Sequence, residues 1–218
     1  MVVWWLISCE SKYKRMTKEI VMSSTALTDE SLDMLFRQAR SHNAWRDKPV
    51  SNDLLKQLYD LMKMGPTSAN SCPGRFVFIK SAEAKEKLKA CLDEGNVKKS
   101  MTAPVVAIIG MDLEFYEQLP KLFPHTDARV WFVGKAEKIQ ETAFRNSSLQ
   151  GAYMMLAARS LGLDCGPMSG FDSVKLDTAF FPDGKVKSNF ICALGYGDPA
   201  GLYPRGPRLD FSEAAEIV

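Results

Sequence analysis

Three short runs of apolar residues constrain the fold of this 218-residue chain more than any other feature. They cover residues 76–79, 105–109 and 190–194 and are apolar at consecutive positions. Strands of this kind must be covered on both faces by other elements. They are also too few and too far apart for a doubly wound nucleotide-binding sheet. The pattern therefore predicts an α+β sandwich, with a central mixed or antiparallel sheet covered by helices.

Three helical patterns can provide that cover. A helix capped by Thr28 is expected to carry four apolar residues on one face: Leu32, Leu35, Phe36 and Ala39. A second helix, capped by Ser51 and stopped by Gly65-Pro66, is expected to bury Leu54, Leu55, Leu58, Leu61 and Met62. The longest pattern, residues 137–161, reads as an apolar helix closed by Gly162. We expect that helix to be central or packed against a second subunit.

Charge and cysteine content exclude several classes of partner. The 28 basic and 26 acidic residues are spread along the chain, so no basic block is available for a nucleic-acid backbone. The five cysteines form no C-x-x-C pair, and neither of the two histidines lies in a metal-binding motif. We therefore expect no disulfide framework, no metal site, no nucleic-acid partner and a reducing, cytoplasmic setting.

The first 27 residues are expected to be a disordered tail or an over-long start, with Met16 and Met22 as alternative initiators. Their apolar run at residues 2–7 is far too short to span a bilayer. Its positive charges follow the run, whereas those of a signal peptide precede it. We expect residues 28–218 to form a single domain that does not associate with a membrane.

Four polar loops at the ends of apolar elements are the places where a ligand would bind. They cover residues 40–46, 66–73, 166–172 and 203–208, and no hydrolase, P-loop or dinucleotide motif competes with them. The first and last contain arginines that can hold a phosphate. The second offers the donors and acceptors that suit a planar heteroaromatic ring. Each loop alone is equally compatible with an ordinary surface turn.

In this order the loops resemble motifs of the nitroreductase flavoprotein family. Two matches lie in the N-terminal half: Arg40-Ser41 before Pro49-Val50, and Pro66-Thr67-Ser68-Ala69-Asn70. Two lie in the C-terminal half: Gly162-Leu163 before Pro167-Met168-Ser169-Gly170, and Arg205-Gly206-Pro207. The resemblance covers residues 27–218. It implies a nitroreductase-like fold, FMN as cofactor, NADPH or NADH as transient reductant, and an intertwined homodimer with the flavin at the subunit interface.

The same resemblance assigns roles to individual residues. It places Arg40, Ser41 and Arg205 at the FMN phosphate, with Arg208 as a weaker candidate. The amides of Ser169 and Gly170 would face the reactive edge of the flavin. The remaining residues expected to bind the cofactor are Asn43, Pro66, Thr67, Ser68, Asn70, Asn96, Pro167 and Met168.

Some residues depart from the family pattern and point to a narrower branch. Asn43 and Trp45 stand where a basic and a smaller aromatic residue are usual, and Cys72 and Gly74 replace a Gln and a Trp. Further segments resemble the branch that reduces malonic semialdehyde to 3-hydroxypropanoate in pyrimidine breakdown: 45–46, 119–125, 127–129 and 144–148. A general nitro- or quinone reductase and a flavin-binding protein without turnover remain alternatives.

A small anionic aldehyde needs a cation for its carboxylate and a proton for its alkoxide. The candidates for binding the carboxylate are Arg129 and Arg145, although surface ion pairs would look the same in the sequence. The candidate proton donor is His125, with water as the alternative. These three residues complete the predicted catalytic set.

Overall fold

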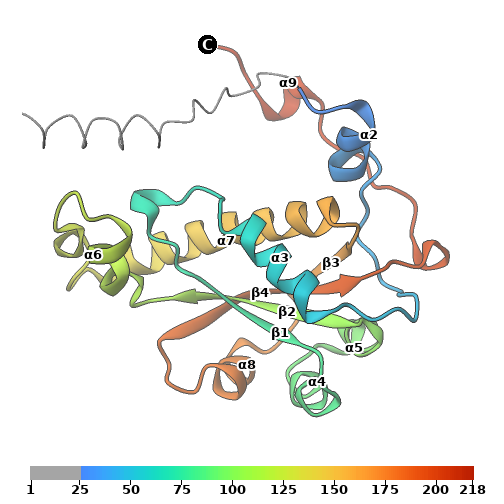
Figure 1. Cartoon of the computed structure of the whole chain (residues 1–218), viewed down its shortest axis with the longest axis horizontal. Helices are drawn as coiled ribbons and strands as arrows, with labels where there is room; N and C mark the ends of the chain where they lie inside the picture. Colours follow the sequence, from blue (N-terminus) through green and yellow to red (C-terminus); the bar gives the residue numbers. More distant parts are fainter. Residues whose placement is uncertain (1–25) are drawn as a thin grey trace, which may run out of the picture.

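A computed structural model describes residues 26–218 and contains a four-stranded antiparallel sheet (Figure 1). The strands are β1 (Gly74–Ile79), β2 (Val105–Asp112), β3 (Asp164–Met168) and β4 (Val186–Gly195), in the order β1-β2-β4-β3. Every neighbouring pair is antiparallel. The predicted α+β class is confirmed. Most of the predicted tail, including Met16 and Met22, lies outside the described residues.

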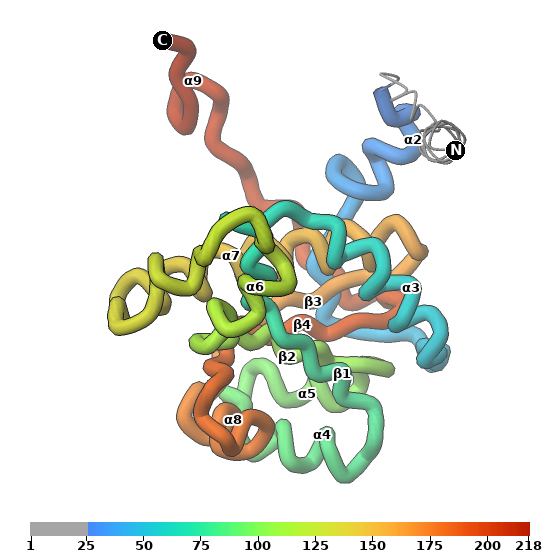
Figure 2. The backbone as a smooth tube through the Cα atoms, turned by 60° about the vertical axis from the view of Figure 1, so that its left-hand side comes forward, coloured from blue at the N-terminus to red at the C-terminus, as the bar shows by residue number. Residues whose placement is uncertain are grey.

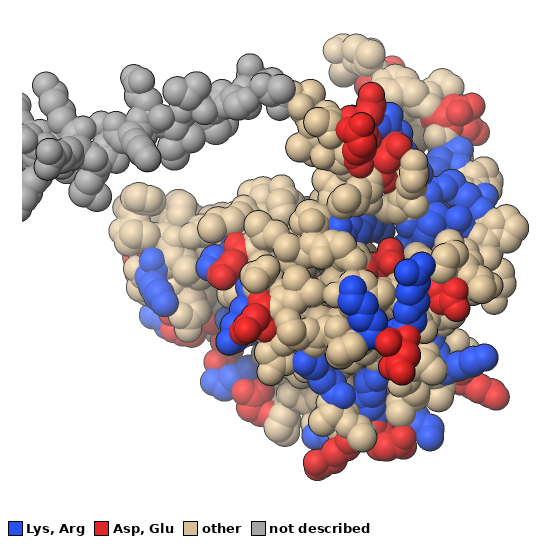
Figure 3. Space-filling view, turned by 45° about the vertical axis from the view of Figure 1, so that its right-hand side comes forward, with Lys and Arg blue, Asp and Glu red and all other residues tan. Residues whose placement is uncertain are grey.

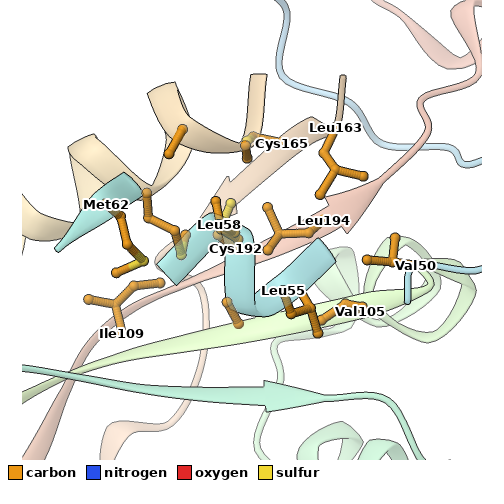
Figure 4. Close-up of a cluster of buried hydrophobic side chains, with 14 residues drawn as sticks. Val50, Leu55, Leu58, Met62, Val105, Ile109, Leu163, Cys165, Cys192 and Leu194 are labelled. Atoms are coloured by element: carbon orange, nitrogen blue, oxygen red, sulfur yellow. The ribbon is translucent and has the colours of Figure 1, made fainter. Parts of the chain in front are cut away.

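Helices cover both faces of this sheet, as the apolar strands require (Figures 1 and 2). One face carries α3 (Asn52–Met62) and α7 (Ala136–Ser160), and the other carries α4 (Ala82–Lys89), α5 (Glu94–Thr102) and α8 (Ser173–Phe180). Side chains of β2 alternate between the two cores: Val105 and Ile109 pack under α3 and α7, whereas Val106 and Ile108 pack on the opposite side. Figure 4 shows Leu58 of α3 among these core residues.

Shorter elements surround the two layers. A third apolar cluster holds η3 (Phe115–Gln118), α6 (Leu119–Leu122) and η4 (Ala128–Trp131) against the start of α7. The described part of the chain begins with α2 (Asp29–Leu32) and a π-helical turn, η1 (Asp33–Arg37), and ends with η5 (Pro199–Gly201) and α9 (Phe211–Ala214). Both α2 and α9 project from the body (Figure 2). No helix in the described part of the chain is long and apolar enough to cross a bilayer.

The prediction from sequence missed β3, which it read as part of a loop. This strand contains Gly166-Pro167, a pair that is typical of turns. A proline is tolerated here because β3 lies at the edge of the sheet, where one side of the strand has no neighbouring strand. The three predicted strands are confirmed, and each extends to the bounds of β1, β2 or β4.

The predicted helix starts are confirmed, but parts of their buried faces are not. Thr28 caps α2 by accepting from Ser31 N at 3.3 Å, yet none of the residues of α2 and η1 is buried. Phe36 is 53% exposed, and Ala39 lies beyond η1. Ser51 caps α3, where only Leu55, Leu58 and Met62 are buried. Leu54 is partly buried and Leu61 is 47% exposed, so the buried stripe is narrower than predicted.

The C-terminal end of α7 follows the prediction closely. Gly162 has a φ of +76° and donates to Arg159 O at 2.9 Å, while Leu163 N donates to Ala158 O at 2.9 Å. This pair of bonds is a Schellman motif, in which a left-handed glycine ends the helix. The expectation of an apolar helix was wrong, because α7 also buries a polar row: Thr142, Asn146, Ser147 and Gln150.

Replacing Gly162 with alanine should lower the free energy of unfolding by about 1 kcal/mol, because a Cβ is unfavourable at this positive φ. A Cβ on Gly162 would meet nothing within 4 Å, so the cost comes from the backbone alone. Gly95 of α5 has equally open surroundings and no positive φ. Gly95→Ala is therefore the control and should be neutral or slightly stabilising in urea denaturation. An equal loss in both variants would contradict the prediction.

Candidate functional site

An open cleft of about 630 Å³ lies between the segment after η1 and the C-terminal segment. Its lining includes five arginines, and we call it the arginine cleft: Arg37, Arg40, Arg159, Arg205 and Arg208. Ser41 and Asn43 line it as well. Figure 3 shows a group of basic side chains on this side of the molecule. The structure thus brings together the predicted phosphate-binding residues of the first and last loops.

Four of the five guanidinium groups have no carboxylate partner among residues 26–218. Only Arg37 is paired, with Asp29 at 2.7 Å and Asp33 at 2.6 Å. The other four donate to backbone carbonyl oxygens: Arg40 to Tyr203, Arg159 to Leu35, Arg205 to Ala39, and Arg208 to Gly206 and Pro207. Four positive charges without a counter-charge in one cleft are the donor set of an anion site.

Residues near the open edge of β3 link the arginine cleft to α5. The Lys99 Nζ atom lies 3.5 Å from Asn43 Oδ1, and burial lowers the pKa of Lys99. One turn earlier on α5, Asn96 Nδ2 donates to Gly170 O at 2.8 Å. A Cβ on Gly170 would lie 2.5 Å from Asn96 Nδ2, so a larger residue here would displace the Asn96 side chain from its present contact. Asn96 and the third predicted loop therefore lie beside the arginine cleft, which they adjoin through Lys99 and Asn43.

The second predicted loop lies elsewhere and has an unusual backbone. Three of its non-glycine residues have positive φ angles: Ala69 at 51°, Asn70 at 48° and Cys72 at 41°. Such conformations cost roughly 1–3 kcal/mol each and persist only where their surroundings enforce them. The side chain of Asn70 donates to Leu122 O at 2.8 Å, which fixes the loop against α6.

The length of α7 separates this loop from the arginine cleft. Near the middle of the helix Asn146 accepts from Ser68 N, and in its last turn Arg159 lines the arginine cleft. At 1.5 Å per residue these two positions are about 20 Å apart. The first, third and fourth predicted loops therefore lie together in one chain, whereas the second lies apart from them along α7 (Figure 1).

The predicted catalytic residues lie in the part of the molecule that surrounds the second loop. His125 is exposed, and its ring packs edge-on against Phe123 with 5.4 Å between centroids. Arg129 pairs with Glu117 at 2.7 Å, and this hydrogen bond raises the pKa of Arg129. Arg145 pairs with Glu141 one turn away on α7. Both guanidinium groups thus have carboxylate partners, unlike four of the five in the arginine cleft.

Three basic residues at the site were missed by the prediction: Arg37, Arg159 and Lys99. Arg159 stands in the last turn of a helix, where a basic residue is common for electrostatic reasons alone. Lys99 lies one turn after Asn96 on α5, and that spacing was the only available signal.

Comparisons with known proteins identify the family of this chain. The model of the nitroreductase family matches residues 36–197. A Burkholderia lata protein named "Putative NADH dehydrogenase/NAD(P)H nitroreductase" is 63% identical over 193 residues, which cover 88% of this chain and 99% of the relative. A relative of the same name from Polynucleobacter asymbioticus is 60% identical over 195 residues, 89% of this chain and 100% of its own.

Solved structures share the fold. A crystal structure from Exiguobacterium sibiricum, described as "a putative nitroreductase in complex with FMN", aligns with a TM-score of 0.77 and 21% identity. The alignment covers 89% of this chain and 99% of the neighbour. The family match over most of the chain, the high identity of the relatives and the shared fold together show that this chain belongs to the nitroreductase family.

Proposed function

We propose that this chain is an FMN-dependent oxidoreductase that takes electrons from NADPH or NADH. The observation that carries the proposal is the arginine cleft, where four guanidinium groups lack a carboxylate partner among the described residues. A phosphate group would supply the missing negative charge through charge-assisted hydrogen bonds. The names of the relatives and the FMN complex of a structural neighbour support the same assignment.

The surroundings of β3 fit the rest of the cofactor. The amides of Ser169 and Gly170 donate to no acceptor within residues 26–218, so they are available to a ligand at the sheet edge. Asn43, Asn96 and Lys99 add polar groups beside this edge. When bound there, FMN would accept a hydride from the nicotinamide and pass it to the substrate. The protein would hold the phosphate at Arg40 and Arg205 and orient the ring near Gly170.

We further propose that the functional unit is a homodimer. Ser68 and Asn70 lie about 20 Å along α7 from the arginine cleft, so a second copy is needed to bring both to one flavin. In the described chain α7 leaves large apolar side chains exposed on both flanks of its outer face: Phe144 on one flank, and Leu149 and Tyr153 on the other. Exposed apolar surface of this kind marks protein interfaces.

For the substrate we propose malonic semialdehyde, which would be reduced to 3-hydroxypropanoate. The proposal rests on the residues shared with that branch of the family, and three of them lie near the second loop: His125, Arg129 and Arg145. The substrate carboxylate would compete with Glu117 for Arg129 or with Glu141 for Arg145. His125 is exposed and so accessible as a proton donor to the alkoxide.

A general nitroreductase is the second candidate, because the relatives at about 60% identity carry that name. Both candidates share the flavin and the fold, and they differ in the substrate pocket. Comparing kcat/KM for malonic semialdehyde with kcat/KM for a nitroaromatic compound separates them.

Anaerobic addition of NADPH to the FMN-loaded protein should bleach the flavin absorbance, and malonic semialdehyde should then restore it. Arg129→Ala and Arg145→Ala should leave the bleaching intact, and at least one should raise KM for the aldehyde about tenfold by removing a charged hydrogen bond. If a nitroaromatic compound restored the flavin absorbance and malonic semialdehyde did not, the second candidate would be favoured. Bound flavin that NADPH and NADH both fail to bleach would contradict a redox function.

A further inference from the structure

Two buried carboxamides on successive turns of α7 hold the two ends of residues 67–74, which we call the clamped loop. Asn146 is 1% exposed, and its Oδ1 atom accepts from Ser68 N at 2.8 Å. Gln150 is 6% exposed, and its Oε1 atom accepts from Gly74 N at 2.7 Å. The two side chains are four residues apart and so lie on one face of the helix.

Neighbouring groups fix the geometry of both contacts. Asn146 Nδ2 donates to Thr142 O at 2.8 Å, which fixes the carboxamide with its oxygen toward the loop. A Cβ on Gly74 would lie 2.7 Å from Gln150 Oε1, so any larger residue here would push the carboxamide away from its present contact. This accounts for Gly74, one of the residues that depart from the family pattern.

Between these two ends the loop adopts a backbone that is unfavourable on its own. The left-handed residues Ala69, Asn70 and Cys72 all lie between Ser68 and Gly74. Three backbone amides inside the loop also find acceptors there: Asn70 N donates to Thr67 O and Ser71 N to Ser68 O, both at 3.0 Å, and Cys72 N donates to Thr67 Oγ1 at 3.1 Å. Because the two ends are tied to a rigid helix, the loop has less freedom to relax toward an extended conformation.

We propose that Asn146 and Gln150 are positioning residues that fix the clamped loop for flavin binding. They act through the backbone of Ser68 and Gly74 and do not touch the ligand themselves. The geometry of the clamp stands on its own, whereas its effect on the cofactor rests on the proposed function. The buried polar row of α7 thus has a role beyond packing.

Amide hydrogen exchange followed by NMR tests the clamp without reference to the cofactor. In Asn146→Leu the Ser68 amide should exchange about 10–100-fold faster, and in Gln150→Met the Gly74 amide should do the same, because each loses its acceptor. Asn189→Leu is the matched control. Asn189 Nδ2 contacts Ser147 Oγ and Ser148 Oγ on α7, both at 2.9 Å, and its side chain makes no hydrogen bond to the loop. Unchanged exchange of both amides in the two clamp variants would overturn the proposal.

FMN affinity then tests the positioning role. The dissociation constant should rise about tenfold in Asn146→Leu and in Gln150→Met. It should stay near the wild-type value in Asn189→Leu and in Gln150→Glu, which keeps an acceptor oxygen. Faster exchange with unchanged FMN affinity would overturn the positioning role. If the wild-type protein bound no FMN, the proposed function would fail, while the exchange data would still decide whether the clamp exists.

Discussion

Replacing Arg40 and Arg205 together with alanine should weaken FMN binding by about 1,000-fold. Each guanidinium group is expected to make a charge-assisted hydrogen bond to the phosphate worth about 1.5–3 kcal/mol, or roughly 10–100-fold in affinity. Riboflavin lacks the phosphate, so its affinity should change far less. Quenching of flavin fluorescence on titration measures both dissociation constants.

Arg37→Ala provides the control for this experiment. Arg37 lines the same cleft, but Asp29 and Asp33 already neutralise it, so FMN affinity should stay close to that of the wild type. Arg40 and Arg205 also tie residues 39–40 to residues 203–205 through carbonyl contacts. Riboflavin separates the two effects, because a general loosening of the cleft would weaken both ligands equally. That outcome would argue against phosphate binding by these arginines.

Gly166→Ala should lower the free energy of unfolding by about 1–3 kcal/mol, as expected for overpacking of a buried site. A Cβ at this position would lie 2.5 Å from the His42 carbonyl oxygen and 3.2 Å from Trp45 Cζ2. The backbone of His42 cannot move away freely, because His42 N donates to Cys165 O at 2.9 Å. Urea denaturation measures the loss of stability.

The same substitution should also weaken FMN binding, since His42 stands between Ser41 and Asn43 of the arginine cleft. Gly206→Ala is the control, because Gly206 lines the cleft and has only Arg208 Nη1 within 4 Å of an added Cβ. It should leave both stability and affinity nearly unchanged. If Gly166→Ala kept wild-type stability and FMN affinity, the close contact between His42 and β3 would not be needed for either property.

The parts of the fold that the sequence predicted are those with strong local signals. Ser51 and Gly162 form hydrogen bonds with residues close in sequence, so the sequence alone predicted their roles as helix caps. The helices α4, α5 and α8 were not identified as helices, because each buries a single residue and so lacks a clear apolar stripe: Leu88, Ser100 and Leu176. The edge strand β3 was hidden by its proline.

The candidate site divides in the same way. Arg40 and Arg205 were predicted because they stand in motifs that occur along the chain in the same order as in the nitroreductase family. Arg159 and Lys99 join the site only through tertiary contacts, with Leu35 O and Asn43 Oδ1 respectively. Asn146 and Gln150 look like surface polar residues of a helix until the loop that they hold is placed against them.

The distance of about 20 Å between the arginine cleft and the clamped loop has a thermodynamic consequence. In the proposed homodimer each flavin contacts both subunits, so cofactor loading and subunit association become linked equilibria. Linkage is reciprocal: FMN must tighten the dimer by the same factor by which dimer formation tightens FMN. Dilution of the protein should then release flavin, and added flavin should oppose dissociation by mass action. In the proposed homodimer, the length of one helix would thus make the assembly state of the protein sensitive to the supply of its cofactor.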